Sequence, residues 1–490
     1  MILVLVAVCA LSFWLYSSGS AGRTSGPASE TLHSLAILPF AVNDNSKHLE
    51  IVGDGVVEDI IGILSRYPNL RVTSRSTSFR YKGKELDPQK IGLELGASYV
   101  LSGRISQEAG RYIIKTEFLK TEDGSLAFPG NYARLESDVP QLAPDISQQL
   151  VAKLNSIYSL NNDAVKGKGL TKNAGAYQKF LQARFLLQKR NPSDCVQAIT
   201  VLQGALALDP EFASAYASLA EANFLSAGEE GGLPYTEANR AALNAAERAV
   251  AIDPSLSEAH AILGAESLYG KFDLKRAEAE YQKAIELNPS NAFAHFWYGS
   301  LLVMKGLSEE GLRHHRLAAE ADPLSPAIIV GLGQGYFFTR DFDKAAKQFR
   351  KALELDSNYQ DAHYWLGNTY IQLKEYLNAL NELSPGRSNS ASSNVSSDSG
   401  RALLEEFWRS RIADWSNKTP NVDYPTVVMA HLYAYLGERE KAYANLKLAF
   451  DSRATSSKDM SGLLYVKVDP RLDLLRGDPR FLQLIKDIGL

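Results

Sequence analysis

The chain has 490 residues, which is too long for one ordinary core and implies two or more domains, or one domain and an array. With 45% hydrophobic and 22% charged residues it has the composition of a soluble globular protein, and its net charge of −4 excludes a general basic field for nucleic acid. The two cysteines, Cys9 and Cys195, exclude a disulfide framework.

Residues 1–16 are apolar except for Ser12, and residues 17–33 read as a flexible linker rich in Ser and Gly. A membrane-spanning helix needs about 20 apolar residues. A cleaved signal segment normally begins with Lys or Arg, and neither precedes this stretch. We therefore expect a single transmembrane helix at 1–16, with a cleaved signal segment as the alternative.

Strands and helices alternate over residues 34–155, which predicts a small α/β domain. Val56 and Ile60 fall at helical spacing, and Asp54 is placed to cap that helix. Ala109-Gly110 separates two alternating runs and predicts a β-hairpin. The predicted elements are strands at 34–40, 71–74, 99–105 and 111–119 and helices at 52–67, 89–95 and 139–154.

Four blocks of this domain resemble, in order and at the usual spacing, the TolB-like amino-terminal domain that precedes tetratricopeptide repeats in many bacterial proteins. The chain departs from that family at 128–134, where it has Pro129-Gly130-Asn131-Tyr132 in place of a tryptophan-containing strand, which leaves the last strand open. The matching blocks are 35–40 (LAILPF), 54–61 (DGVVEDII), 78–84 (SFRYKGK) and 94–103 (ELGASYVLSG).

The resemblance implies an architecture more than an activity. Such pairs of a TolB-like domain and repeats often follow a class III adenylate cyclase domain, a winged-helix DNA-binding domain or a protein kinase domain, with a membrane span between. The resemblance therefore implies a single-pass protein of the bacterial inner membrane, whose soluble part we expect in the periplasm.

A pattern with a period of 34 residues organises the rest of the chain, and this period is typical of a helical-hairpin array. The helix-ending phrases that close at Pro210, Pro254, Pro289, Pro323 and Ser357 are 44, 35, 34 and 34 residues apart, and an insertion at 227–235 lengthens the first interval. In the clearest pair of repeats, the equivalent positions hold Ala277 and Gly311, Tyr281 and His315, Ala284 and Ala318, and Pro289 and Pro323.

Following this period in both directions predicts tetratricopeptide repeats over 173–383, after a linker at 156–172. Residues 384–400 are rich in Ser and Asn and predict a disordered loop. We expect the last repeat-like helices at residues 401–468 and a terminal cap at residues 469–490. The predicted hairpins are 177–208, 212–252, 257–287, 292–321, 326–355, 359–383 and 426–450, with a single helix at 403–415.

The run Gly331–Gly335 contains three glycines and could suggest a nucleotide-binding loop. Such a loop requires a preceding strand and a helix that begins at the phosphate, whereas these glycines fall in the middle of a predicted helix at repeat positions. We therefore interpret them as packing residues, and we expect no cofactor and no catalytic residue.

Three histidines, His260, His295 and His363, occupy equivalent repeat positions that other repeats fill with Tyr216 and Ile329. Residues that are interchangeable with Tyr and Ile are typical of half-buried packing groups. Metal ligands must converge on one centre, but stacked repeats keep equivalent positions apart. We therefore expect no metal site.

The inner surface of the array, formed by the first helix of each repeat, is the expected protein-binding groove. It lacks a cluster of Lys or Arg that could hold a terminal carboxylate, so we expect an extended or helical apolar peptide. Alternatively, some of its aromatic residues pack against neighbouring helices. The predicted groove residues are Glu221, Phe224, Leu268, Phe296, Ser300, Val330, Gln334, Phe337, Tyr364, Asn368 and Gln372.

These features favour a non-enzymatic scaffold or adaptor that is tethered to a membrane and binds a protein or peptide partner, with no nucleic acid bound by this chain alone. A second hypothesis makes the chain the regulatory half of a signalling protein, whose cyclase, kinase or winged-helix output domain lies upstream or on a partner chain. A third places an enzyme in the TolB-like domain and assigns activity to Asp54 and Glu58. The oligomeric state stays open.

Overall fold

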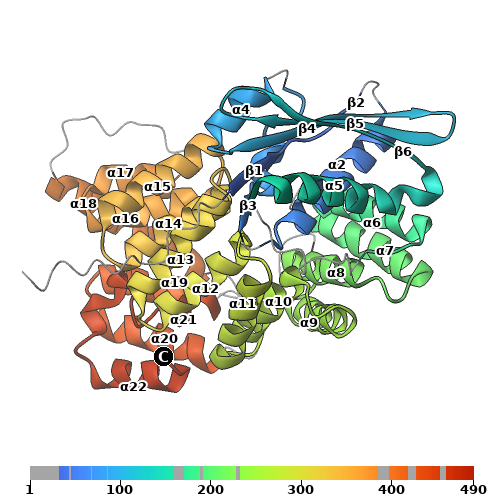
Figure 1. Ribbon diagram of the computed structural model, residues 1–490. Helices are drawn as coiled ribbons and strands as arrows, with labels where there is room; N and C mark the ends of the chain where they lie inside the picture. Colours follow the sequence, from blue (N-terminus) through green and yellow to red (C-terminus); the bar gives the residue numbers. More distant parts are fainter. Residues whose placement is uncertain are drawn as a thin grey trace, which may run out of the picture.

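The structure is a computed structural model, and it combines an amino-terminal α/β domain with a curved array of helix pairs (Figure 1). It describes residues 33–42, 46–67, 69–84, 87–158, 170–187, 191–227, 232–384, 397–417, 426–452 and 460–490.

One six-stranded sheet, with the order β3-β1-β4-β5-β6 and β2 paired to β4, forms the α/β domain. β1 is parallel to β3 and β4, whereas β4, β5 and β6 are antiparallel. Ala109 and Gly110 turn the predicted hairpin with positive φ angles of 48° and 72°. The strands are β1 (His33–Ile37), β2 (Ala41–Val42), β3 (Leu70–Val72), β4 (Tyr99–Glu108), β5 (Arg111–Lys120) and β6 (Leu126–Leu135).

The strand β6 forms across the segment that departs from the TolB-like pattern. Pro129 lies opposite Glu117 of β5, and because β6 is the last strand of the sheet, the missing N–H of a proline is tolerated there. The Tyr132 side chain is buried, and its hydroxyl donates to Gln149 Oε1 at 3.0 Å. A buried tyrosine therefore anchors the edge strand that the sequence left open.

The helices α2 and α5 pack together under the sheet (Figure 1). α2 begins at Lys47, earlier than predicted, because the Ser46 hydroxyl caps it by accepting from Leu49 N–H at 3.3 Å. Asp54 lies inside this helix, where it is buried and paired with Lys82, so its predicted capping role is wrong. The domain's helices are α2 (Lys47–Leu64), α3 (Arg75–Phe79), α4 (Pro88–Glu94), η2 (Glu136–Gln141) and α5 (Leu142–Tyr158).

Six helix pairs follow, at the positions of the first six predicted hairpins. Small residues let the helices of a pair approach: a Cβ atom added to Gly264 would lie 2.4 Å from the ring of Tyr281, and one added to Gly333 would lie 2.5 Å from Phe349. The helices are α6 (Ala174–Leu187), α7 (Pro192–Leu208), α8 (Ala213–Ser226), α9 (Tyr235–Ile252), α10 (Ser257–Ala265) with the π-helical turn η4 (Glu266–Gly270), α11 (Leu274–Leu287), α12 (Ala292–Met304), α13 (Ser308–Ala321), α14 (Pro326–Phe338), α15 (Phe342–Leu355), α16 (Gln360–Gln372) and α17 (Tyr376–Leu383).

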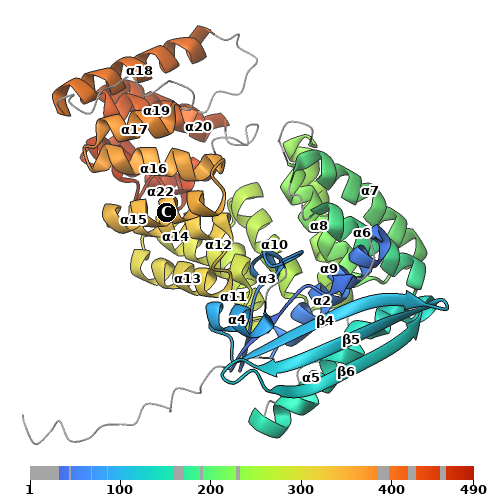
Figure 2. The same ribbon diagram turned by 90° about the horizontal axis from the view of Figure 1, so that it is seen from above.

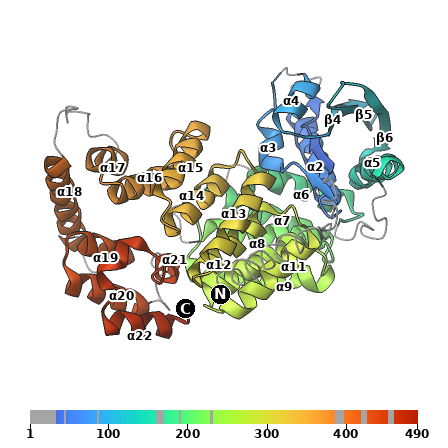
Figure 3. The ribbon, with the colours of Figure 1, turned by 60° about the vertical axis from the view of Figure 1, so that its left-hand side comes forward.

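The last part of the chain folds back toward the middle of the array (Figure 3). Of the predicted loop at 384–400, residues 385–396 lie outside the described part, and residues 397–400 already belong to α18. The helices here are α18 (Ser397–Asn417), α19 (Thr426–Tyr435), α20 (Arg439–Ser452), α21 (Met460–Leu464), η5 (Pro470–Leu475) and α22 (Pro479–Ile488).

The α/β domain and the first helix pair share one hydrophobic core. Gly55 of α2 meets α6 so closely that a Cβ atom there would lie 2.2 Å from Leu181. Beside this contact Arg184 Nη1 donates to Asp59 Oδ1 at 2.5 Å, and the Tyr177 hydroxyl also donates to Asp59. The domain therefore caps the first end of the array.

A second, smaller contact joins the α/β domain to the turn between α13 and α14 (Figure 2). The Thr77 hydroxyl donates to Asp322 Oδ1 at 2.9 Å, and Arg80 Nε donates to the Leu324 carbonyl at 2.9 Å. The domain thus touches the array at two places that are far apart in the sequence.

The transmembrane helix predicted at 1–16 requires a correction of the fold class. That segment lies outside the described residues, and none of the helices that the structure describes is long and apolar enough to cross a membrane. The observed fold class is a small α/β domain joined to an all-α array.

Candidate protein-interaction groove

The first helices α8, α10, α12, α14 and α16 pack against one another in sequence order, and all eleven predicted groove residues lie on them or on η4. These residues differ in exposure, since some are covered and others remain half-buried. The buried ones are Leu268, Ser300, Val330, Phe337 and Asn368, and the half-buried ones are Glu221, Phe224, Phe296, Gln334, Tyr364 and Gln372.

Trp297 of α12 stands at the centre of an aromatic cluster on the part of the groove formed by the second to fourth helix pairs. Its ring centre lies 5.6 Å from Phe224 of α8, edge to face, and 5.7 Å from Phe293 and 6.5 Å from Phe296 on its own helix. All four rings are half-buried. We call Phe224, Phe293, Phe296 and Trp297 the aromatic patch. Trp297 also packs against the buried Tyr281 of α11, with ring centres 6.4 Å apart.

The part of the groove formed by α14 and α16 is filled by the chain itself, through Arg471 of η5. The Arg471 guanidinium carbon lies 4.8 Å from the ring centre of Trp365, 5.7 Å from Phe337 and 6.0 Å from Tyr364. Its Nη1 also donates to the Tyr364 hydroxyl at 2.9 Å. A cation enclosed by three rings is attracted by all of them, so this contact holds η5 in the groove.

Asp469 holds the Arg471 side chain in place from the other side. It caps η5 by accepting from Arg471 N–H at 2.9 Å, and its Oδ2 accepts from Arg471 Nη2 at 2.7 Å. His431 Nε2 of α19 lies 3.1 Å from the same oxygen. Burial opposes the charge on Asp469, but Arg471 and His431 outweigh it and hold the pKa of this carboxyl well below its usual range.

Further contacts between the end of the chain and the array lie closer to α12. The Tyr465 ring stacks on Phe338 with centres 4.4 Å apart, and Lys467 Nζ donates to the Lys305 carbonyl at 3.0 Å. A single buried cluster joins the inner faces of η4 and α12 to the end of the chain, with Leu268, Tyr298, Leu301, Leu302 and Met304 on one side and Leu463, Leu464, Val466, Leu472 and Leu475 on the other. The chain's own end therefore covers the predicted residues Leu268 and Phe337.

The sequence Asp-Pro-Arg occurs twice in this end segment, with different outcomes. At Asp478 and Arg480 the same local turn forms, but the Arg480 side chain is 47% exposed and binds Glu440 of α20 at 2.8 Å. The Arg471 side chain is 9% exposed. The local sequence therefore builds the turn, and only the aromatic surroundings make one copy a groove contact.

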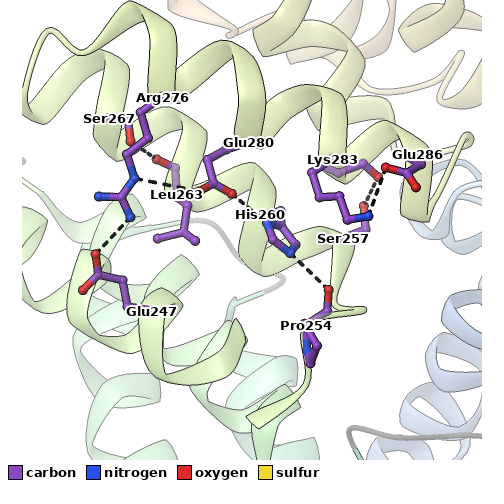
Figure 4. A network of polar contacts seen from close by, with 11 residues as sticks. Glu247, Pro254, Ser257, His260, Leu263, Ser267, Arg276, Glu280, Lys283 and Glu286 are labelled. Carbon is purple, nitrogen blue, oxygen red and sulfur yellow. Dashed lines mark hydrogen bonds and ion pairs between the residues drawn. The ribbon is translucent and has the colours of Figure 1, made fainter. Parts of the chain in front are cut away.

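The repeat-equivalent histidines tie the turn before each repeat to its second helix, as Figure 4 shows for His260. His260 Nδ1 lies 2.7 Å from Glu280 Oε2, and its Nε2 lies 3.2 Å from the Pro254 carbonyl. His363 repeats this arrangement with Glu382 and the Ser357 carbonyl. These histidines are structural links, and within the described ranges no three His, Cys, Asp or Glu side chains gather as a metal site.

The fourth helix pair contains a buried group of three histidines. His295 Nδ1 lies 2.9 Å from His314 Nδ1, so one of these rings donates to the other. Burial lowers the pKa of His314 to about 4 and that of His315 to about 3, with a smaller contribution from neighbouring charges. All three are therefore neutral at pH 7.

The two carboxylates proposed for enzyme activity are engaged in ion pairs. Glu58 binds Arg75 and Arg184, so it joins the α/β domain to α6. Burial raises the pKa of Asp54 to about 6, although Lys82 opposes the shift. Both side chains are buried and paired with basic residues, which favours a structural role.

The most important side chains that the sequence prediction missed are Trp297, Trp365 and Arg471. Both tryptophans lie one residue after a position assigned to the groove, so a wider helical face would have included them. The repeated Asp-Pro-Arg was visible, but no local pattern distinguishes its two copies.

Comparison with protein families identifies tetratricopeptide repeats at residues 259–291, 280–313 and 333–374. Residues 31–153 match the HilA/YgeH-like transcriptional regulator, second domain. The chain thus carries tetratricopeptide repeats, and the TolB-like assignment of the amino-terminal domain stays a prediction.

Three curated relatives match the chain over shares of different size. The protein provisionally named adenylate cyclase 3 of Rhizobium meliloti is 29% identical over 186 residues, which are 38% of this chain and 32% of the relative. Anaphase-promoting complex subunit 3 of Schizosaccharomyces pombe is 26% identical over 29% of this chain and 21% of its own length. Transcriptional regulator HilA of Salmonella typhimurium is 24% identical over 324 residues, 64% of this chain and 56% of its own length. The chain thus spans between a fifth and just over half of these relatives.

Solved structures with some likeness include a thermophilic TPR protein of Thermus thermophilus, 20% identical over 40% of this chain and 99% of its own, with a TM-score of 0.34. The type IV pilus biogenesis factor PilW is 18% identical over 42% of this chain and 90% of its own, with a TM-score of 0.35.

Proposed function

We propose that this chain is a non-enzymatic scaffold that binds a protein partner at the aromatic patch. The observation that carries the proposal is the contrast within one groove. The rings of Phe224, Phe296 and Trp297 are half-buried, whereas Arg471 and Tyr465 already fill the stretch along α14 and α16. Half-exposed aromatic rings in a concave surface are the usual anchors of protein interfaces.

The expected partner segment is apolar and extended or helical. The predicted groove residues on the neighbouring helices α8 and α14 include Glu221 and Gln334, which add hydrogen-bonding groups and one negative charge. A segment that buries apolar side chains against Trp297 and places a polar or basic residue toward Glu221 fits this chemistry.

The double variant Phe224→Ala with Trp297→Ala tests the proposal in the full chain. Capture of protein partners from a lysate of the source organism, read by mass spectrometry, is expected to drop at least tenfold relative to the unchanged chain. Tyr336→Ala is the matched control, since Tyr336 is also a half-buried aromatic residue on a first helix but faces Arg316 and Lys344. Unchanged capture by a double variant with native circular dichroism would refute the aromatic patch as the binding surface.

A second candidate function, the regulatory half of a signalling protein, is favoured by the match of residues 31–153 to a domain of transcriptional regulators. The likeness to an adenylate cyclase over 38% of the chain supports the same idea. The same capture experiment separates the two candidates. Partners that carry a cyclase, kinase or winged-helix domain support the regulatory function, and partners without an output domain support the scaffold.

A further inference from the structure

A cavity of about 280 Å³ lies between the α/β domain and the array, next to the smaller of their two contacts. One wall comes from β3 and the end of α4, and the other from the end of α13, the α13–α14 turn and α15. The hydrogen bonds of Thr77 to Asp322 and of Arg80 to Leu324 fix the two walls beside it. Clefts between domains are common sites for small ligands, and this volume is just below the range for drug-sized molecules.

Each wall brings one cation and one carboxylate to the cavity. Arg71 and Glu94 belong to the α/β domain, and Lys351 and Glu320 belong to the array. Among the described residues, no ion pair within 4.0 Å involves any of the four. Opposite charges that face a common space without pairing directly leave room for a ligand that carries both charges.

The Tyr81 side chain is a second, independent feature of this cavity. It lines the cavity and is only 8% exposed, yet among the described residues its hydroxyl forms no hydrogen bond, although the Glu94 carboxylate lies nearby. Burial, and then the nearby Glu94 carboxylate, raise the pKa of this hydroxyl to about 12, so it keeps its proton. A buried hydroxyl without a partner is unfavourable, so such a group is normally satisfied by water or a ligand.

The backbone of β3 adds hydrogen-bonding groups. β3 is an edge strand that pairs only with β1, and Thr73 N–H is directed to the Leu35 carbonyl of β1. Peptide groups alternate direction along a strand, so the N–H and C=O of Val72 point away from β1. Val72 lines the cavity, which makes this peptide edge available to a bound molecule.

We infer that this cavity binds a small zwitterion with the charges of a free α-amino acid. Arg71 and Lys351 attract the carboxylate, Glu94 and Glu320 attract the ammonium group, and the Tyr81 hydroxyl and the β3 edge supply hydrogen bonds. A purely anionic ligand would face two carboxylates, and a purely cationic ligand would face two cations. Because both walls take part, the bound zwitterion stabilises the contact between the α/β domain and the fourth and fifth helix pairs.

Isothermal titration of the full chain with each of the twenty standard amino acids tests this inference, with acetate and methylammonium as single-charge probes. We expect at least one amino acid to bind, and both single-charge probes to bind at least tenfold more weakly than it does. Failure of all twenty to bind, or binding of acetate as tight as that of every amino acid, would overturn the inference.

Two variants locate the site. Arg71→Ala and Lys351→Ala are expected to weaken amino-acid binding at least tenfold. Lys347→Ala is the matched control, because Lys347 is an exposed lysine on the same helix, outside the cavity lining. Equal affinity in all three variants would place any binding elsewhere and overturn the assignment. The titration of the unchanged chain needs no partner protein, so its outcome is separate from that of the aromatic patch.

Discussion

The guanidinium of Arg471 lies 4.8 Å from the ring of Trp365, although the two residues belong to the end of the chain and to the sixth helix pair. Arg471 also neutralises Asp469, whose side chain is fully buried. Through these two contacts, the end of the chain covers most of the inner face of the array along α14 and α16.

Arg471→Ala is expected to destabilise the fold by about 3–5 kcal/mol, because it leaves Asp469 as a buried carboxylate without its main partner. Chemical denaturation followed by circular dichroism measures the change. Arg480→Ala is the matched control, since Arg480 forms the same local turn at the surface, where solvent screens its ion pair and the loss of stability should be small. Equal losses for the two variants would argue against closure by Arg471.

The contribution of His314 and His315 to the stability of the array is expected to fall as the pH decreases from 6.5 to about 4. In the unfolded chain a histidine takes up a proton below its ordinary pKa of 6.5, whereas burial lowers the pKa of His314 to about 4 and that of His315 to about 3. The unfolded state therefore binds more protons in this interval, so the stability is present above pH 6.5 and is lost as the pH falls.

Melting temperatures measured between pH 7 and pH 4 for the unchanged chain and for His314→Gln test this pH dependence. Glutamine keeps a hydrogen-bonding group next to His295 but does not titrate. The decrease between pH 6.5 and pH 4 should be smaller in the variant, and parallel curves would contradict the role of His314.

Glu266 predicts a pH dependence of the opposite sign. This carboxyl in η4 is 3% exposed, and its Oε1 has no hydrogen-bond partner. Burial raises its pKa to about 8, so the folded chain holds a proton that the unfolded chain has lost above pH 4.5. The contribution of Glu266 to stability is therefore full below pH 4.5 and falls as the pH rises through 8.

Glu266→Gln, which mimics the protonated carboxyl, is expected to stabilise the chain by about 4 kcal/mol at pH 8 and to have little effect at pH 4.5. Denaturation midpoints at these two pH values provide the measurement. If the stability difference between Glu266→Gln and the unchanged chain is the same at pH 8 and at pH 4.5, Glu266 is charged in the folded state.

The turns inside the repeats offer a simple stabilising change. Phe272, Gly306, Arg340 and Lys374 recur 34 residues apart, and each has a positive φ, between 54° and 88°. A left-handed conformation is unfavourable for a side chain with a Cβ atom by about 1–2 kcal/mol. Lys374→Gly is expected to raise the stability by about 0.5–1 kcal/mol, after the entropy lost by glycine is subtracted.

Gly306→Ala is the matched change in the opposite direction and should lower the stability by a similar amount. Thermal unfolding of both variants checks the pair. If both substitutions destabilise the chain, the positive φ angles are not the determining factor at these turns.

The sequence was sufficient to predict the helices and strands that are determined by residues close together in the chain. The 34-residue spacing located the hairpins because each repeat needs a small residue opposite a large one, as at Gly264 and Tyr281. The strands β1, β3, β4 and β5 followed from short apolar or alternating runs. β6 did not, because Pro129 is unusual in a strand and is acceptable only at the edge of a sheet.

The state of the groove could not be predicted from the sequence. A helical period identifies which residues share a face, but it cannot show what covers that face. Phe337 and Phe296 were both assigned to the groove face of their repeats, yet Phe337 is fully buried near Arg471 and Phe296 is half-buried. The difference depends on contacts between residues more than a hundred positions apart, and only the three-dimensional path of the chain decides it.

The return of the chain end to the inner face also changes how the array should fold. An ordinary array of repeats has contacts only between neighbours, so its repeats can unfold one after another from the ends. Here the hydrogen bond from Arg471 to Tyr364 closes a loop of 107 residues and links the last segment to the middle of the array. We therefore expect the helix pairs from α12 to α20 to unfold as one cooperative unit, and to fold more slowly than an open array of equal length.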